Sequence, residues 1–240
     1  MLTWKFNHIY VLALAAVWPT ISRAQPDAHR LATGEFVYQS LENGRDVGRG
    51  RVTIRSLSGG ERYDFRAEIT GSAVQRWEAV ATRTFEPLSA TITFGPDTVG
   101  SAPSFTLEYH AGRVTGFVIP HSGPSRGIRR QIDTIVPAGI IDQRIDWASV
   151  MASDLAVGRR FPLAVYDPQL GVSPVAVTVD SAERVHVAAG TFDVFRVTYR
   201  IAKATGTEQY VVLVTRSLPR VMVREEFPDG VVSDLVERRK

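Results

Sequence analysis

Apolar and polar residues alternate along most of this chain, and this two-residue period constrains its fold more than any other feature. In residues 63–69, Tyr63, Phe65, Ala67 and Ile69 alternate with charged residues. The same period recurs in four further segments: residues 51–55, 88–94, 105–110 and 195–201. Because successive side chains of a strand point to opposite faces, each segment predicts a half-buried strand with one face in water.

Short glycine-containing pairs separate the predicted strands, and glycine supplies the positive φ that tight hairpin turns require. These pairs are Gly59-Gly60, Ala111-Gly112, Thr205-Gly206 and Asp229-Gly230. Two other segments, residues 172–179 and 210–214, are nearly continuous apolar runs. Such runs are typical of strands covered on both faces, so we expect these two segments at the centre of the fold.

One segment has a helical period. Between Asp142 and Leu155, apolar residues fall on one helical face, and Gly158 follows where a helix C-terminus is expected. A helix with such a stripe, and with Trp147 beside it, must bury the stripe against the sheet. The sequence therefore predicts a mainly β fold: a large curved antiparallel sheet, either an open or half barrel or a folded-over sandwich, with one short helix packed on its concave face.

The N-terminus has the pattern of a secretory signal peptide. Lys5 precedes a short apolar run, residues 9–18, and the small residues Ser22 and Ala24 lie at the positions that specify cleavage. We expect residues 1–24 to be removed after Ala24, giving a periplasmic or secreted protein. Residues 25–33 are then a flexible N-terminus, and residues 34–240 form a single β-rich domain in two parts joined by a loop near 120–130.

Composition excludes several classes of protein. The chain has no cysteine, so disulfides, thiolate metal sites and cysteine nucleophiles are excluded. Its net charge of +3 falls to +1 without the predicted signal peptide, which contains Lys5 and Arg23 and no acidic residue. Arg126, Arg129 and Arg130 form the nearest approach to a basic cluster, which we interpret as a solvated loop, so nucleic acid is not an expected partner. No transmembrane segment is expected after residue 24.

The C-terminal half resembles a known family. The run from Glu183 to Val197, with Ala189-Gly190-Thr191-Phe192 at its centre, is similar to a signature of domain-of-unknown-function family 3108 of exported bacterial proteins. Further similar pieces are Phe36-x-Tyr38 and Ser217-Leu218-Pro219-Arg220-Val221. That family looks like a relative of the open-barrel lipoprotein carriers of the periplasm. The resemblance implies an envelope location and a curved sheet with an apolar concave side, and it brings no catalytic residues.

Three functions are compatible with these features. The first is a binding or carrier protein for an apolar, acyl or lipid-like ligand, with a lining formed by Trp77, Phe94, Phe105 and Trp147, although aromatic residues at strand spacing are more often core. The second is a non-catalytic envelope scaffold or assembly factor that acts through a sheet edge or an exposed apolar face. The third is a serine hydrolase that uses Ser125.

The sequence gives little support to catalysis. Ser125 lies in a G-x-S-x-G pattern, but the residues after it have strand character, whereas a nucleophile elbow requires a helix there. Three carboxylate pairs, Asp64 with Glu68, Asp142 with Asp146 and Glu225 with Glu226, are interpreted as surface charge. His29, His110, His121 and His186 share no metal-binding spacing. We therefore expect no enzyme activity, no cofactor and no metal site.

Overall fold

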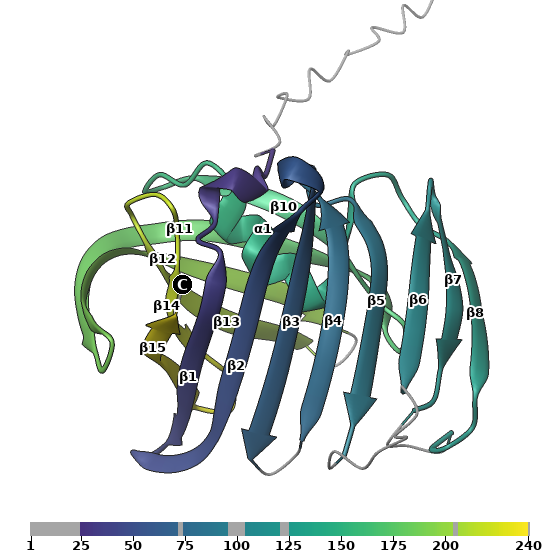
Figure 1. Ribbon diagram of the computed structural model, residues 1–240, viewed down its shortest axis with the longest axis horizontal. Coiled ribbons are helices and arrows are strands. Elements are labelled where there is room, and N and C mark those ends of the chain that lie inside the picture. Colours follow the sequence, from purple (N-terminus) through teal and green to yellow (C-terminus); the bar gives the residue numbers. More distant parts are fainter. Residues whose placement is uncertain (1–24, 72–73, 96–103, 121–124, 204–205, 240) are drawn as a thin grey trace, which may run out of the picture.

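The computed structural model describes residues 25–71, 74–95, 104–120, 125–203 and 206–239. Within these ranges the chain forms one 15-stranded sheet, four short helical segments and the turns that connect them (Figure 1). The first eight strands are β1 (Gly34–Glu42), β2 (Arg45–Leu57), β3 (Arg62–Gly71), β4 (Gln75–Thr82), β5 (Pro87–Phe94), β6 (Phe105–His110), β7 (Arg113–Val118) and β8 (Arg130–Ile135).

The remaining strands are β9 (Ile140–Asp142), β10 (Arg160–Asp167), β11 (Gly171–Val187), β12 (Gly190–Lys203), β13 (Gly206–Thr215), β14 (Met222–Glu226) and β15 (Val231–Arg239). The helical segments are α1 (Asp146–Ala152) and the single 3-10 turns η1 (Ala28–Arg30), η2 (Ser58–Gly60) and η3 (Gln143–Ile145).

The sheet consists of two meanders that meet at the pairing of β1 with β15. Its order runs from β8 back to β1, continues through β15, and then runs back to β9. The edge strands β8 and β9 do not pair with each other, so the sheet is not closed into a barrel. It folds over instead: β10 to β13 cross behind β1 to β5, and α1 lies between these two layers (Figure 1). The predicted curved sheet with a helix on its concave side is confirmed.

The prediction of a wholly antiparallel sheet needs one correction. All pairs of strands are antiparallel except β9 and β10, which are parallel. Parallel neighbours require a crossover connection, and here η3 and α1 lie within that connection. The same helix therefore connects two strands and fills the space between the layers.

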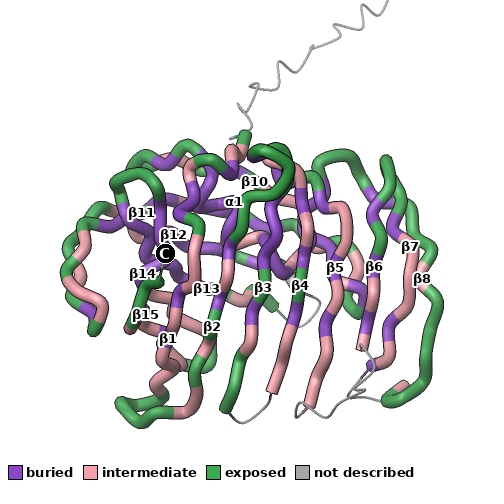
Figure 2. The backbone as a smooth tube through the Cα atoms, in the orientation of Figure 1, coloured by how far each residue is buried: buried purple, intermediate pink, exposed green. Residues whose placement is uncertain are grey.

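The predicted alternation is reproduced in part by burial. In β3, Tyr63, Phe65 and Ala67 are buried as predicted, but Asp64, predicted on the wet face, is also buried, and Ile69 is 39% exposed. Buried and less buried residues follow one another along the strands of the front layer (Figure 2). Residues 211–214 of β13 are all buried, as the continuous run predicts. The corresponding prediction for residues 172–179 is wrong, because β11 alternates there: Val175 and Val177 are buried whereas Val172 and Ala176 face solvent.

The helix is shorter than predicted. It ends at Ala152, and Ser153 is already extended, with ψ 163°. The Arg220 guanidinium donates to the carbonyl oxygens of Met151, at 2.6 Å, and of Ser153. Because a distant arginine satisfies these carbonyl groups, the helix needs no glycine at its end. Gly158, predicted as that glycine, lies instead in the turn before β10, where its N–H donates to the Val179 carbonyl at 2.8 Å.

The segments around the predicted domain boundaries are placed as follows. Residues 1–24, the expected signal peptide, lie outside the described residues. In residues 25–33, expected to be flexible, Ala28, Leu31 and Ala32 are buried, and the Asp27 carboxylate accepts hydrogen bonds from Arg83 at 2.7 and 2.8 Å. The loop near 120–130 connects the paired strands β7 and β8, and the chain passes to the second meander through residues 136–139.

A buried network of charged and hydroxyl groups connects the two meanders across the open side of the sheet. The Asp142 carboxylate in β9 is fully buried and accepts hydrogen bonds from the Tyr109 hydroxyl in β6 and from Arg144 Nε, the latter at 2.5 Å. Arg144 also donates to the Asp167 carboxylate in β10 at 2.9 Å and to the Tyr166 carbonyl at 3.3 Å. The network therefore holds β6 against β9 and β10, although β6 forms no backbone pairing with either strand.

The charges of this network depend on one another. Burial alone lowers the pKa of the Arg144 guanidinium, but the carboxylates of Asp142 and Asp167 more than offset it, so the net pKa shift is upward. Burial, followed by the negative charge of Asp142, raises the pKa of the Tyr109 hydroxyl. Arg144 thus remains charged and Tyr109 remains protonated, which lets both donate to Asp142.

We expect Asp142→Ala to lower the free energy of unfolding by about 3–5 kcal/mol, because it leaves the buried Arg144 charge without its closest partner. Chemical denaturation of the two proteins measures this loss. The matched control is Asp133→Ala, which removes an exposed carboxylate from its pair with Arg113 and should leave the unfolding midpoint nearly unchanged. Equal effects of the two substitutions would contradict a special role for the network.

Candidate functional site

A cavity of about 430 Å³ lies between the two layers of the folded sheet, beside α1. All four residues predicted as a ligand lining contribute to its wall. Trp77 of β4, Phe94 of β5 and Phe105 of β6 come from the first meander, and Trp147 comes from α1. The structure therefore brings these four aromatic side chains to one place, although they are up to 70 residues apart in the sequence.

The rest of the wall is mostly apolar and comes from both meanders. Three further aromatic residues, from the second meander, contribute: Tyr199, Tyr210 and Phe227. Aliphatic side chains cover the surface between the rings, namely Val52, Ala67, Ile69, Ile92, Ile201 and Val212. The helix therefore leaves part of the concave space unfilled, and that space has the apolar walls that favour the chain of an amphiphilic molecule.

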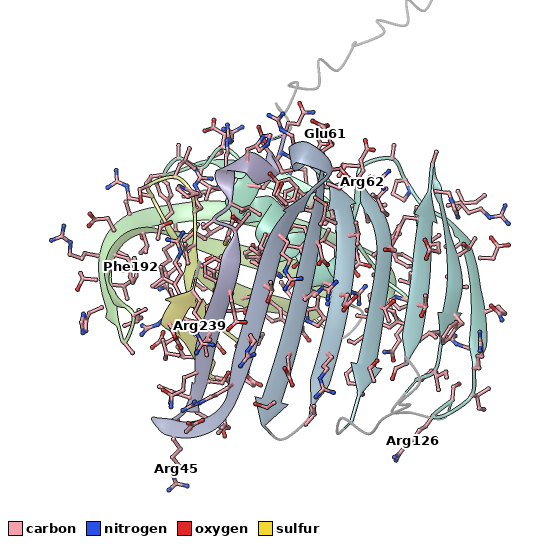
Figure 3. All side chains as sticks on the ribbon, in the orientation of Figure 1. Arg45, Glu61, Arg62, Arg126, Phe192 and Arg239 are labelled. Carbon is pink, nitrogen blue, oxygen red and sulfur yellow. The ribbon has the colours of Figure 1, made fainter. Side chains whose placement is uncertain are left out.

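Solvent reaches the cavity where its lining residues are exposed. Ile69, near the end of β3, is 39% exposed, and Gln169 in the turn after β10 is also exposed. Farther out, charged side chains project from the rims of the sheet, as Arg45 and Arg126 do at its lower edge (Figure 3). The cavity wall is thus mostly apolar, whereas these charged side chains lie on the outside of the sheet.

Three carboxyl groups line this mostly apolar cavity, and two of them, those of Asp146 and Glu225, form no ion pair among the described residues. Asp146 is the first residue of α1, and its Oδ1 accepts a hydrogen bond from the Trp147 backbone N–H at 2.5 Å. Glu225 lies in β14 opposite Val212 of β13, and both side chains contribute to the cavity wall. Within the described residues, the Glu225 carboxyl has no hydrogen-bond partner in the protein.

The environment strongly perturbs both acids. Burial among apolar groups raises the pKa of Asp146 to about 7. Burial also raises the pKa of Glu225 to about 8, and the negative charge of Asp146 adds to this shift. Desolvation disfavours an ionised carboxylate, and two neighbouring carboxylates disfavour each other's charge. Both groups therefore titrate near neutral pH, where perturbed side chains in cavities often mark functional sites.

The described cavity wall contains one cationic side chain, and that side chain already has partners within the protein. Among the described lining residues, Arg144 is the only arginine or lysine. Its guanidinium is occupied by Asp142, Asp167 and the Tyr166 carbonyl. The cavity therefore offers carboxyl groups to a ligand and no free cation. Within the described ranges, no cluster of three histidine, aspartate or glutamate side chains could hold a metal ion.

The interpretation of the carboxylate pairs as surface charge is wrong for one or both members of each pair. Asp64 and Asp142 are buried, and Asp146 and Glu225 line the cavity. The Asp64 carboxylate accepts a hydrogen bond from Arg66 at 2.8 Å. One signal in the sequence could have identified Glu225: the two-residue period places it on the same strand face as Phe227, whereas Arg224 and Glu226 point outward to Asp234 and Arg196. Asp146 carries no comparable signal, because its surroundings come from strands distant in sequence.

The arginine cluster and two of the histidines that the sequence analysis singled out lie at the surface. Arg126, Arg129 and Arg130 are exposed, and so are His110 and His186. Ser125 lies in a turn whose Gly127 N–H donates to the Pro120 carbonyl at 2.8 Å. The next element is strand β8, so the strand-to-helix context of a nucleophile elbow is missing there. Gly123 and His121 lie outside the described residues.

Fold and site together define a class: an open, barrel-like β-sheet protein whose two layers enclose an apolar cavity beside a single short helix. The chain belongs to the family described as protein of unknown function DUF3108, whose model matches residues 36–236. The Ala189–Phe192 signature of the resemblance lies at the turn between β11 and β12, where Val187 pairs with Gly190. That signature therefore connects two paired strands of the sheet.

A solved structure shares this fold. A β-barrel-like protein of the domain of unknown function DUF1849 from Brucella abortus has a TM-score of 0.53 at 12% identity, over 88% of this chain and 99% of the other. A candidate exported protein with a YmcC-like fold from Bacteroides fragilis has a TM-score of 0.41 at 10% identity, over 90% of this chain and all of the other.

Two further comparisons are negative. No curated protein matches this sequence. Among the described residues, no helix has the length and apolar character needed to cross a membrane.

We expect the two cavity acids to make the protein less stable as the pH rises. Their folded-state pKa values lie above the ordinary values of 3.8 and 4.5, so each carboxyl stabilises the fold while protonated. That contribution is complete below about pH 4 and is lost as the pH rises through 7 and 8, with a slope of up to about 1.4 kcal/mol per pH unit for each group.

Glu225→Gln should therefore flatten the pH dependence of the free energy of unfolding. The variant should match the wild type near pH 4 and exceed it at pH 9, as measured by denaturation at fixed pH values. Glu226→Gln is the control, because the neighbouring side chain bonds to Arg196 outside the cavity. A Glu225→Gln profile parallel to that of the wild type would show that Glu225 is not a desolvated acid.

Proposed function

We propose that this protein binds or carries an apolar, acyl or lipid-like ligand in the cavity between the layers of its sheet. The observation that carries the proposal is a cavity of about 430 Å³ lined by Trp77, Phe94, Phe105 and Trp147. Small-molecule sites in proteins are commonly about 300–1,000 Å³, mostly apolar, with a few polar groups that fix orientation. The present cavity fits that description in volume, lining and polar content.

The site of action that we propose is the cell envelope. The support is the pattern at the N-terminus, with a basic residue, a short apolar run and a small-residue cleavage site after Ala24. Cleavage there would begin the exported chain next to Asp27, whose pair with Arg83 holds the start of the folded domain. A protein that moves hydrophobic molecules through an aqueous compartment needs such an interior, because water would otherwise contact the apolar chain.

A second candidate function, an envelope scaffold, is favoured by the edge strand β8. Five of its six residues are exposed, among them Ile135 at 86%. Ile128, just before the strand, is 60% exposed. An unpaired strand edge with exposed apolar residues can accept a strand from a partner. This function needs β8 and not the cavity, so the two candidates are separable.

A larger side chain in the cavity wall should weaken the binding of an apolar probe. In Ala67→Leu the added carbon atoms occupy space beside Trp77, so we expect the fluorescence response to the neutral dye N-phenyl-1-naphthylamine to fall at least tenfold. The measurement is a fluorescence titration, with thermal unfolding to verify that the variant folds. Ala176→Leu, on the exposed face of β11, is the matched control and should bind the dye as the wild type does.

Two results would decide against the carrier function. One is a wild-type protein that gives no response to the dye. The other is equal dye binding by the wild type and Ala67→Leu, which would place the dye on an outer surface. Crosslinking of a partner through β8 would then support the scaffold function.

A further inference from the structure

The polar groups of the cavity are unusual for a site that holds only an apolar chain. Three carboxyl groups, Asp146, Asp167 and Glu225, line it with a single guanidinium, that of Arg144. Asp167 is paired with Arg144 at 2.9 Å, whereas Asp146 and Glu225 are not paired with any cation among the described residues. A carboxyl group in a mostly apolar cavity with no cation beside it costs free energy when it ionises, so the position of these two groups favours a ligand that interacts with them.

Aromatic residues share the cavity wall with these two acids. Asp146 precedes Trp147 on α1, and the Tyr199 hydroxyl donates to the Trp147 carbonyl at 3.4 Å. Burial raises the pKa of the Tyr199 hydroxyl, and the negative charges of Asp146 and Glu225 add to this shift. Burial also raises the pKa of the Tyr210 hydroxyl, followed by its hydrogen bond to Glu208 at 2.9 Å and the charge of Glu208, with smaller contributions from Glu225 and Asp146. Both hydroxyls therefore lie within electrostatic range of both acids. The Tyr210 ring meets the Phe227 ring edge-on at 6.1 Å.

Carboxylates together with aromatic faces form the environment that binds organic cations. A cation gains from the negative face of an aromatic ring, and an ammonium group donates hydrogen bonds to carboxylates. An anionic head group would meet two carboxyls and would find the guanidinium of Arg144 already occupied. A sugar would suit the rings but not the aliphatic wall formed by Ile69, Ile92 and Val212.

We infer that the ligand of this cavity is a cationic amphiphile, an amine with an apolar chain, whose ammonium group is held by Asp146 and Glu225. The inference rests on the proposed binding function and specifies the chemical class of the ligand. The apolar chain lies along the wall of the first meander, against Trp77 and Phe105. The ammonium group lies among the rings of the second meander, opposite that wall.

Protonation couples to this binding. Before the ligand enters, Asp146 and Glu225 are partly protonated at neutral pH, and the other charged groups around them are Arg144, Asp142 and Asp167. The hydroxyls of Tyr38, Tyr199 and Tyr210 lie within electrostatic range of Glu225, and their raised pKa values keep them protonated. Glu208 adds a further negative charge beside Tyr210, whose hydroxyl donates to it at 2.9 Å. An ammonium group favours both carboxylates in the charged form, so binding releases protons and strengthens between pH 6 and 9, where an alkylamine remains charged.

The test compares three ligands with the same twelve-carbon chain: dodecylamine, dodecanol and dodecanoate. Each is titrated against N-phenyl-1-naphthylamine bound to the mature protein, at concentrations at which the ligand is monomeric in water. We expect dodecylamine to bind at least tenfold more tightly than dodecanol at pH 8, and dodecanoate to bind more weakly than dodecanol. Calorimetry in buffers of different ionisation enthalpy should detect protons released with dodecylamine at pH 7 and none with dodecanol.

The variants are the single substitutions Asp146→Asn and Glu225→Gln and the double variant that combines them. Each substitution keeps the shape of the side chain and removes its charge. Dodecylamine affinity should fall about tenfold for each carboxyl removed, the loss expected for a charge-assisted hydrogen bond, while dodecanol affinity stays within about twofold. Glu226→Gln, on the outer face of β14, is the matched control and should leave all three affinities unchanged.

The outcomes separate this inference from the proposed function. Binding of all three ligands without a head-group preference, or a preference for dodecanoate, overturns the cationic ligand and leaves the carrier function standing. A preference for dodecylamine that persists in the double variant also overturns it. If neither the dye nor any of the three ligands binds the wild type, the proposed function itself fails.

Discussion

The buried pairing of Asp142 with Arg144 and Tyr109 holds this structure in its folded-over form. A sheet of fifteen strands whose edges do not meet has no hydrogen-bonded closure of its own. The network supplies a substitute, because it joins β6 in one meander to β9 and β10 in the other through groups shielded from water. Its charges are compensated within the cluster, which is the condition under which buried ions can be tolerated.

The cavity is a consequence of this closure. The network holds the two layers together on one side, and the pairing of β1 with β15 connects them on the other. The helix α1 fills only part of the space between, so aromatic and aliphatic faces from both meanders remain uncovered around the acids Asp146 and Glu225. The desolvation that perturbs these acids and the apolar wall that suits a lipid-like chain therefore have the same structural origin.

Local features of the fold could be predicted from the sequence, and features that depend on distant segments could not. The two-residue period identified strands such as β3 and β6, because burial of one sheet face imposes that period on neighbouring residues. The end of α1 was misplaced because Arg220, far along the chain, satisfies its carbonyl groups. The interpretation of Asp142, Asp146 and Glu225 as surface charge fails because Asp142 is buried, and Asp146 and Glu225 line a cavity, only once the sheet folds over. The four aromatic residues met in one cavity, but their role as a ligand lining remains a prediction.

The most direct test of a cavity built for a ligand is native mass spectrometry of the protein purified from its own cells without detergent. The account predicts a bound molecule that is released on denaturation, and its loss from Ala67→Leu but not from Ala176→Leu. An unliganded mass for the wild type, or the same bound mass in all three proteins, would contradict it.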